Sequence, residues 1–395
     1  MNDRKYNKTI WACFIGYIVQ AIVNNFVPLL FLTFQSTYDI SLQKITLLIT
    51  FNFGIQLLVD LTSVFFVDRI GYKVSMIIAH GLSAAGLILL TILPDQLSDP
   101  FVGFLISVMI YAIGGGLLEV LVSPVVESCP TKNKEKAMSL LHSFYCWGHV
   151  AVVLLSTLFF KMAGIENWKY MALIWALIPI FNGIFFMTVP FAPLVEEGET
   201  GLSMGQLFKK KIFWVLMLMM LCAGASEQAV SQWASTLAEK NFGIEKTIGD
   251  LVGPLFFALL MGCSRAFYGK FGEKINLEKF MKCSVILCII SYLMIALVPV
   301  PALGILGCGL CGLSVGILWP GTFSISSASI KNGGTALFAM LALAGDVGCS
   351  GGPTFVGMIS GILGDNLRMG ILVGLIFPIF MFISILLIRK LREKS

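Results

Sequence analysis

The chain has 395 residues, of which 57% are hydrophobic and only 12% are charged, and its formal net charge is +5. Soluble domains carry about 25% charged residues, so a core buried in water does not explain this composition. Lipid must therefore be the solvent for much of the chain, and we expect an all-α integral membrane protein. The ten cysteines lie mostly within apolar runs and show no metal-ligand spacing, so we expect neither a metal site nor a cofactor.

Apolar runs of about 20 residues, long enough to cross the hydrocarbon of a bilayer, recur twelve times along the chain. We place them at residues 9–35, 43–67, 73–93, 101–128, 137–161, 170–190, 212–238, 247–269, 279–299, 302–329, 334–362 and 367–388. The first run lacks a small-residue cleavage site and is expected to be a span, not a signal peptide. The longest polar break divides the runs six and six. We therefore expect an N-terminal six-helix bundle (1–190), a cytoplasmic linker (191–211) and a C-terminal six-helix bundle (212–395).

The cations are distributed unevenly between the two sides of the expected membrane. One alternating set of loops, which includes both termini and the linker, holds 20 of the 27 Lys and Arg, and the other set holds six. Because cytoplasmic loops are enriched in Lys and Arg, we expect both termini to be cytoplasmic. The short loops favour a multi-pass protein of the plasma membrane, specifically a bacterial cytoplasmic membrane.

The two halves resemble each other in one loop. The loop after the second run reads Asp68-Arg69-Ile-Gly71-Tyr-Lys73, and the loop after the eighth reads Gly269-Lys270-Phe-Gly272-Glu-Lys274, at an offset of 201 residues. Parallel six-helix repeats with a binding site at their interface are a known transporter architecture. The repeat therefore predicts a solute carrier with a central site.

Glu119 is the most informative polar residue, because it lies inside the apolar run 101–128. A charged side chain at the bilayer centre costs about 2.5–3.5 kcal/mol on insertion scales, so it is rarely there without a role. Gly114, Gly115 and Gly116 precede it and would let neighbouring helices approach closely. We expect Glu119 to face a polar cavity between membrane helices.

Other polar side chains inside the runs form stripes at helical spacing, such as Asn52, Gln56 and Asp60. Amides and carboxylates bind hydroxyl groups as donors and acceptors, and tryptophan stacks against a sugar face. The candidates for substrate binding are Asn24, Asn25, Gln56, Glu119, His142, Tyr145, His149, Glu227, Gln228, Gln232, Trp233 and Trp319. The candidates for cation coupling are Glu119, Asp60, Glu227 and Asp346.

Two simpler interpretations stay open for these residues. Asparagine and glutamine often only join one membrane helix to another. Charges near the cytoplasmic ends of helices are expected to form a gate that locks those ends together, with Glu127 paired to a loop cation such as Arg69. The gate candidates are Asp68, Arg69, Gly71, Lys73, Glu127 and Arg265.

These motifs resemble the major facilitator superfamily over the whole chain. Its loop signature, Gly-x-x-x-Asp-Arg-x-Gly-Arg-Arg or Lys, is met in part by residues 68–73, with Val64 in place of the leading Gly and Tyr72 in place of an Arg. The resemblance implies the major facilitator fold, with twelve transmembrane helices as two six-helix pseudo-repeats.

Within that superfamily the chain looks most like the fucose–galactose–glucose–proton symporter group. The similar segments are Ala21 to Asn25, Leu118-Glu119 to Ser123-Pro124, Leu141 to Gly148, and Gly224 to Trp233. The resemblance implies that Glu119 takes part in sugar recognition and proton coupling. Pro28 stands where the fucose-type members carry an Asp, and Ser123 stands where they carry an Asn.

We therefore expect a secondary active transporter, not an enzyme, that moves a small polar solute, above all a monosaccharide, by alternating access. Its expected partners are that solute, a coupling cation (a proton or sodium) and the lipid bilayer, with no nucleic acid and no second subunit. Two alternatives stay open: efflux of amphipathic drugs or metabolites, and a non-transporting sensor on the same fold.

Overall fold

The computed structural model describes residues 3–130, 134–191, 202, 204–271, 275–330 and 334–392. Those residues are almost entirely helical and include no β-strand. The chain divides into two compact units, Met1–Glu196 and Glu197–Ser395.

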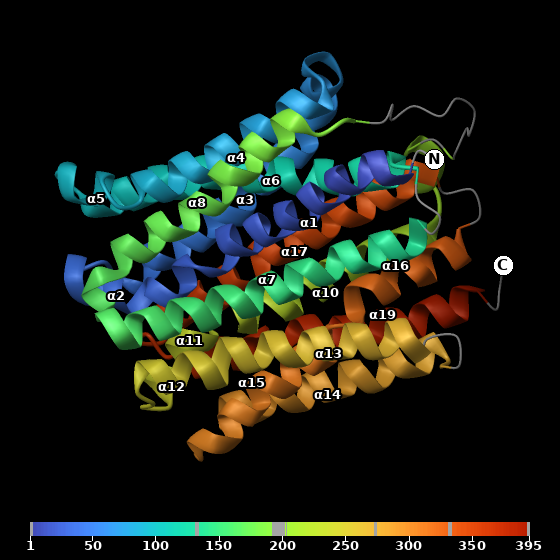
Figure 1. The fold of residues 1–395 in the computed structure, drawn as a ribbon. Helices are drawn as coiled ribbons and strands as arrows, with labels where there is room; N and C mark the ends of the chain where they lie inside the picture. The colour runs from blue at the N-terminus through green and yellow to red at the C-terminus, as the bar shows by residue number, and fades with distance from the viewer. Residues whose placement is uncertain are drawn as a thin grey trace. The chain divides into compact units, whose positions relative to one another are not determined.

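The first unit is coloured from blue to green in Figure 1. Its helices are α1 (Asp3–Asn25), the 3₁₀ helix η1 (Val27–Leu30), α2 (Phe31–Tyr38), α3 (Leu42–Ile70), α4 (Tyr72–Leu89), α5 (Leu93–Gln96), α6 (Pro100–Ser128), α7 (Lys134–Ala163), the 3₁₀ helix η2 (Ile165–Asn167) and α8 (Trp168–Thr188). Within this unit α6 packs against α1, α3 and α4, and α1 packs against α7.

The second unit runs from green to red in Figure 1. Its helices are α9 (Met204–Phe208), α10 (Lys211–Ser231), α11 (Ala234–Thr236), the π-helix η3 (Leu237–Asn241), α12 (Lys246–Asp250), the π-helix η4 (Leu251–Leu255), α13 (Phe256–Phe271), α14 (Leu277–Leu297), α15 (Pro301–Val315), α16 (Leu318–Ser329), α17 (Gly334–Ile362), α18 (Leu367–Gly374) and α19 (Ile376–Arg392). The expected linker 191–211 contains α9, and its residues 192–201 and 203 lie outside the described part of the chain.

Eleven helical segments of the described residues are long and apolar enough to cross a membrane. Together with α17, a helix of 29 residues, they give twelve. The first span, Tyr6–Tyr38, is interrupted where α1 ends and η1 begins. The expectation of an all-α, twelve-helix fold is confirmed.

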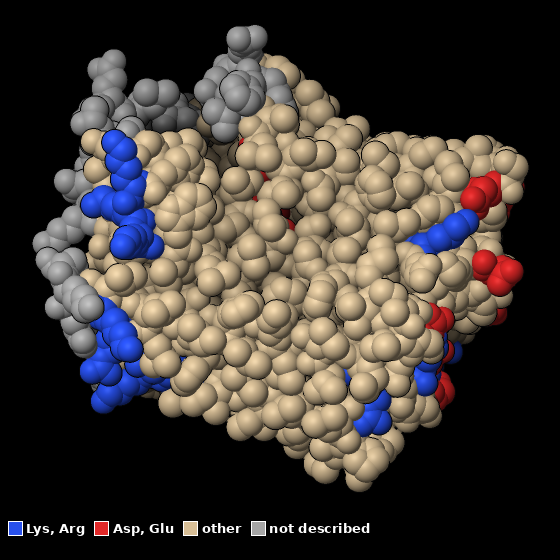
Figure 2. Space-filling model, turned by 180° about the vertical axis from the view of Figure 1, so that it is seen from behind, with Lys and Arg blue, Asp and Glu red and all other residues tan. Residues whose placement is uncertain are grey.

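Helix α8 shows how the spans meet lipid. One side of it is buried and includes Trp175 and Asn182, whereas large apolar side chains such as Phe181 and Ile184 are exposed on the other. A helix that is apolar on its exposed side is stable only in an apolar solvent. In Figure 2 uncharged side chains cover most of the middle of the visible face, and the Lys and Arg atoms lie toward its ends.

Polar contacts at the helix ends join segments of the first unit. The Tyr38 hydroxyl donates to Asp95 Oδ1 at 2.9 Å, and Lys169 pairs with Asp95 Oδ2. The hydrogen bond from the Lys169 ammonium holds the pKa of the Asp95 carboxyl below its usual range. Beside this group, Lys44 Nζ lies 3.3 Å from Asp99 Oδ2. These contacts fix α2, α5 and α8 at one end of the unit.

Glycine allows the closest helix contact in the second unit, between α10 and α17. A Cβ added to Gly348 would lie 2.0 Å from the carbonyl oxygen of Leu221, and one added to Gly224 would lie 2.3 Å from the carbonyl oxygen of Gly345. Small residues let membrane helices pack backbone to backbone in this way. Since Glu227 lies one turn beyond Gly224, this contact also positions the polar part of α10.

We predict that Gly348→Ala destabilises the protein, because the new methyl group meets a backbone atom that no side-chain rotation can move. Overpacking of this kind costs about 1–3 kcal/mol. Gly351→Ala is the matched control on the same helix, since nothing lies within 4 Å of a Cβ there. The midpoint of thermal unfolding of the purified protein in detergent should fall for Gly348→Ala and not for Gly351→Ala. Equal midpoints for the two variants would contradict the close α10–α17 contact.

Candidate functional site

Asn24 and Asn25 lie where the first span is interrupted. Helix α1 ends at Asn25, and Pro28 lies within the 3₁₀ turn that follows. Proline has no N–H to continue the helical bonding, and such breaks are tolerated in membrane helices where neighbouring groups satisfy the backbone. The residue that replaces the expected Asp therefore shapes the backbone beside the paired asparagines.

Buried amide side chains connect α1 to α3. Gln20 Nε2 donates to Gln56 Oε1 at 2.9 Å, and Gln56 Nε2 donates to Asn24 Oδ1 at 2.9 Å. Asn52 Nδ2 donates to the same Asn24 oxygen at 3.1 Å. We call Gln20, Gln56, Asn24 and Asn52 the amide chain. It is a continuous run of hydrogen bonds inside the first unit.

Glu119 of α6 lies at one end of the amide chain, where its Oε2 accepts a hydrogen bond from Gln20 Nε2 at 3.0 Å. The glycines of α6 make this contact possible. A Cβ on Gly115 would lie 3.2 Å from Gln20 Oε1, and one on Gly116 would lie 2.9 Å from Gln56 Cα. Larger residues there would push α1 and α3 away from Glu119.

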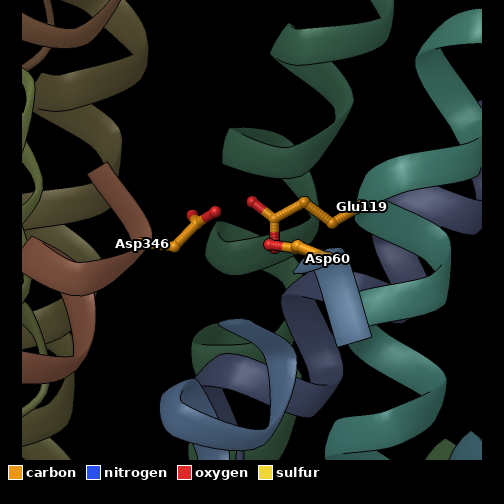
Figure 3. A group of neighbouring side chains, drawn as sticks. All are labelled: Asp60, Glu119 and Asp346. Atoms are coloured by element: carbon orange, nitrogen blue, oxygen red, sulfur yellow. The ribbon is translucent and has the colours of Figure 1, made fainter. Parts of the chain in front are cut away.

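Asp60 adds a second carboxylate on the first unit. It follows Gln56 by one turn of α3, and a carboxylate oxygen of Asp60 lies within 4.8 Å of one of Glu119. Figure 3 shows these two side chains, and it also labels Asp346 of α17, a residue of the second unit. Two carboxylates this close repel each other when both are charged, so a proton or cation between them is favoured.

The α7 candidates differ in their surroundings. The Tyr145 hydroxyl accepts a hydrogen bond from Asn25 Nδ2 at 3.4 Å, whereas His149 is buried. His142 is exposed, and its ring centroid lies 5.4 Å from that of Tyr17. The stripe predicted from the sequence is therefore divided between buried and exposed positions.

One helix contact and two residues of the candidate site were not predicted from the sequence. The Tyr17 hydroxyl lies 3.0 Å from Ser123 Oγ, which joins α1 to α6. Gln20 and Asn52 extend the amide chain at both ends. The available signal was spacing, because each lies four residues from a candidate, Asn24 or Gln56.

In the second unit Glu227 lies in a polar cluster of its own. Arg265 Nη2 is 3.4 Å from Glu227 Oε2, and Gln228 Nε2 donates to Glu227 Oε1 at 3.3 Å. Gln232 Nε2 donates in turn to Gln228 Oε1 at 3.0 Å. Three of the candidate binding residues are thus brought together.

Arg265 is placed differently from the expectation, which grouped it with the cytoplasmic gate. Its guanidinium contacts Glu227, and its Nε donates to the carbonyl oxygen of Gly316 at 3.3 Å. Long side chains on a helix point back toward its N-terminus. Because Lys270 lies at the C-terminal end of α13, the Arg265 side chain tilts away from that end and toward Glu227.

The two candidate tryptophans have different roles. Trp233 is fully buried, and its Nε1 donates to the carbonyl oxygen of Pro353 at 3.0 Å, which fits helix packing better than sugar stacking. Trp319 is half-buried, and its ring lies against Gly345, where an added Cβ would be 2.2 Å from the indole. Gly345 directly precedes Asp346 in α17.

The gate candidates are described only in part. The side chains of Asp68, Arg69 and Glu127 lie outside the described residues. Gly71 has φ of 91°, a conformation that favours glycine, and it joins α3 to α4. Lys73 Nζ donates to the carbonyl oxygen of Val189 at 3.2 Å.

Comparison with known proteins shows the family to which the chain belongs. The family model of the Major Facilitator Superfamily matches residues 12–353. No curated protein sequence matches the chain. A solved bacterial homologue of the human lysosomal transporter Spinster, inward-facing and unoccupied, is similar with a TM-score of 0.76 and 13% identity, covering 98% of this chain and 97% of that one.

Two further solved transporters have a similar fold. The E. coli fucose:proton symporter FucP gives a TM-score of 0.65 at 16% identity, covering 98% of this chain and 99% of that one. The nucleoside transporter NupG gives 0.75 at 12% identity, covering 97% of this chain and 100% of that one. At such identities the structures establish the fold alone, whereas the family model covers most of the sequence. The protein is therefore an integral membrane transporter that belongs to the Major Facilitator Superfamily.

Proposed function

We propose that this transporter imports a monosaccharide, or a similar small polyhydroxylated solute, together with a proton. The observation that carries the proposal is the hydrogen bond between Glu119 and the amide chain. It joins a group that can carry a proton to groups that can bind hydroxyls, within one unit of the protein.

The chemistry of the side chains supports a hydroxyl-rich solute. Each carboxamide offers an acceptor oxygen and a donor nitrogen, which match the two roles of a sugar hydroxyl. Gln228 and Gln232 offer the same groups in the second unit, and Trp319 offers part of an aromatic face there. The fucose:proton symporter shares the fold, although the nucleoside transporter does too, so the side chains and not the fold favour a sugar.

We propose that Glu119 and Asp60 carry the coupling proton. Pro28 excludes a relay through the Asp of the fucose-type members, and the nearby carboxylates of Glu119 and Asp60 supply another acceptor. A proton shared by the two would remove their mutual repulsion. Sodium is the competing cation, and the uptake experiment below includes it.

We further propose that the protein is a monomer of a bacterial cytoplasmic membrane with both termini in the cytoplasm. The support for the cytoplasmic position of the termini is the excess of Lys and Arg in one alternating set of loops. Transport by alternating access follows from the two-bundle plan of the family.

The proposed function is tested by uptake into proteoliposomes. Labelled fucose, galactose and glucose should be offered with an inward proton gradient, with an inward sodium gradient and with neither. We expect at least one sugar to accumulate above its external concentration under the proton gradient only. If no sugar moves under any gradient, the sugar proposal is wrong and efflux of amphipathic compounds becomes the function to test.

The Glu119→Gln variant should separate coupling from binding. Glutamine keeps the size and an acceptor oxygen but carries no transferable proton, so we expect accumulation to fall to the level without a gradient while sugar exchange continues. Glu245→Gln is the matched control, because Glu245 is exposed in the loop before α12. A Glu119→Gln variant that still accumulates sugar would remove Glu119 from the coupling role.

The ion pair of the second unit should behave as a coupled pair. Arg265→Met leaves Glu227 without its guanidinium, and Glu227→Gln combined with Arg265→Met removes both charges. Both side chains keep some exposure, so we expect the double variant to recover about 1 kcal/mol relative to additivity, near the low end for neighbouring residues. Thermal unfolding of the two single variants and the double variant measures this. Strictly additive shifts would show that the pair does not act as a unit.

A further inference from the structure

The amide chain has a direction. Gln20 donates to Glu119 and to Gln56, and Gln56 donates to Asn24. Asn52 donates to Asn24 from the far end. Gln20 Nε2 is thus a donor to both of its neighbours in the chain, and Asn24 Oδ1 is an acceptor from both of its neighbours.

Two buried oxygens of the chain are left over. Within the described part of the protein, neither Gln20 Oε1 nor Asn52 Oδ1 has a hydrogen-bond partner. Both side chains are almost fully buried, at 3% and 5% exposure. A buried acceptor without a partner costs about 1–3 kcal/mol, so two of them at the two ends of one chain require an explanation.

The protonation state of Glu119 sets the direction. An ionised carboxylate only accepts hydrogen bonds, so Gln20 must present its NH₂ group. A protonated carboxyl has an O–H that needs an acceptor. Asp60 faces Glu119 from α3, with a carboxylate oxygen within 4.8 Å of one of Glu119, and Gln20, whose Nε2 lies 3.0 Å from Glu119 Oε2, can offer its Oε1 after rotation. The terminal torsion of a carboxamide is roughly two-fold, so rotating Gln20 by half a turn exchanges its oxygen and nitrogen without moving the backbone.

One rotation forces the others along the chain. If Gln20 Oε1 faces Gln56, then Gln56 must turn its Nε2 toward Gln20. Gln56 Oε1 then faces Asn24, which must turn its Nδ2 toward Gln56. Asn24 no longer accepts from Asn52, so Asn52 turns and its Oδ1 accepts from Asn24 Nδ2.

We propose that the amide chain reverses its hydrogen-bond direction when Glu119 takes up a proton, and that this reversal couples the proton to the substrate groups of Asn24. The proposal rests on the proposed function, because it gives that function its coupling step. The two oxygens that have no partner now, Gln20 Oε1 and Asn52 Oδ1, gain one in the reversed chain, while Gln20 Nε2 and Asn52 Nδ2 give up the acceptors they have now. No covalent bond changes except the O–H formed on Glu119 by the arriving proton.

The reversal has a cost in free energy, which protonation of Glu119 can offset. It gives up the bond from Gln56 Nε2 to the Asn52 carbonyl oxygen, 3.2 Å long, so the present direction is favoured while Glu119 is ionised. Protonation supplies the opposing drive, since the new O–H requires an acceptor. Chained hydrogen bonds polarise one another, so the links are expected to reverse together. Gln20 and Asn52 then act as positioning residues.

Infrared difference spectroscopy tests the reversal without any substrate. The full-length protein in a lipid film, with ¹³C-labelled glutamine and asparagine side-chain carbonyls, is taken from alkaline to acidic buffer. We expect a carboxylic acid band that disappears in Glu119→Gln, and with it a shift of labelled amide carbonyl bands that also disappears in Glu119→Gln. An acid band of Glu119 without any amide shift would overturn the proposal, as would the absence of that acid band.

Gln20→Met provides the sharper variant. Methionine has a similar size and no amide, so the acid band of Glu119 should remain while the amide shift is lost. Gln43→Met is the matched control, because Gln43 is exposed on α3, and it should keep both signals. Persistence of the full amide shift in Gln20→Met would overturn the proposal. If Gln20→Met does not fold, Asn52→Leu at the far end of the amide chain should reduce the amide shift. An unchanged amide shift in Asn52→Leu would also overturn the proposal.

Transport separates this inference from the proposed function. With the sugar that the wild type accumulates, we expect Gln20→Met to lose about tenfold in accumulation relative to its own rate of sugar exchange, within the usual range for coupling between two sites. Accumulation by Gln20→Met at the wild-type level would overturn the amide relay and leave the proposed function intact. If the wild type accumulates no sugar, the proposed function fails, and the infrared result still decides whether the chain reverses.

Discussion

The hydrogen bond between Gln20 and Glu119 is the contact on which the first unit depends. In lipid a polar side chain must find its partner on a neighbouring helix, because no water is available to replace it. That requirement explains why Gly115 and Gly116 precede Glu119, since a Cβ at either would crowd the glutamines of α1 and α3. It also explains why the buried amides of α1 and α3 are hydrogen-bonded to one another. The close helix packing, the burial of the amides and their hydrogen bonds in this unit therefore follow from the same requirement.

The two units hold their glutamates in different ways. Glu227 lies beside a guanidinium, so its negative charge is balanced where it lies. Glu119 is held by an amide and lies near a second carboxylate, Asp60. A balanced charge suits a fixed binding group, whereas a carboxylate next to another suits the uptake of a proton. This difference supports the proposal that Glu119 and Asp60 carry the proton and is consistent with a binding role for Glu227.

The periodicity of the sequence was enough to predict the spans and the polar stripes, because lipid makes both unusually regular. The stripe of Asn52, Gln56 and Asp60 does face other helices, as its spacing of four indicated. Spacing could not show which helix it faces, since that depends on how each helix is rotated in its bundle. The pairing of Gln56 with Asn24 was therefore not foreseen, nor was the contact of Tyr17 with Ser123.

Arg265 shows a second limit of prediction from the sequence. Its short distance in sequence from Lys270 suggested a gate residue, but the backward tilt of helical side chains carries its guanidinium to Glu227. Trp233 shows a third, because an aromatic residue in a polar stripe can serve as a packing anchor, here through Pro353. In both cases residue type and spacing gave the candidates, and the direction of the side chain set its contacts.

The central claim is that sugar and proton enter together, and the most direct measurement is the pH inside proteoliposomes when sugar is added outside. A trapped pH-sensitive dye should report acidification of the lumen on addition of a transported sugar, with no ion gradient imposed and with potassium and valinomycin present to clamp the membrane potential. A sugar that enters without any change of internal pH would contradict proton coupling and with it the role assigned to Glu119.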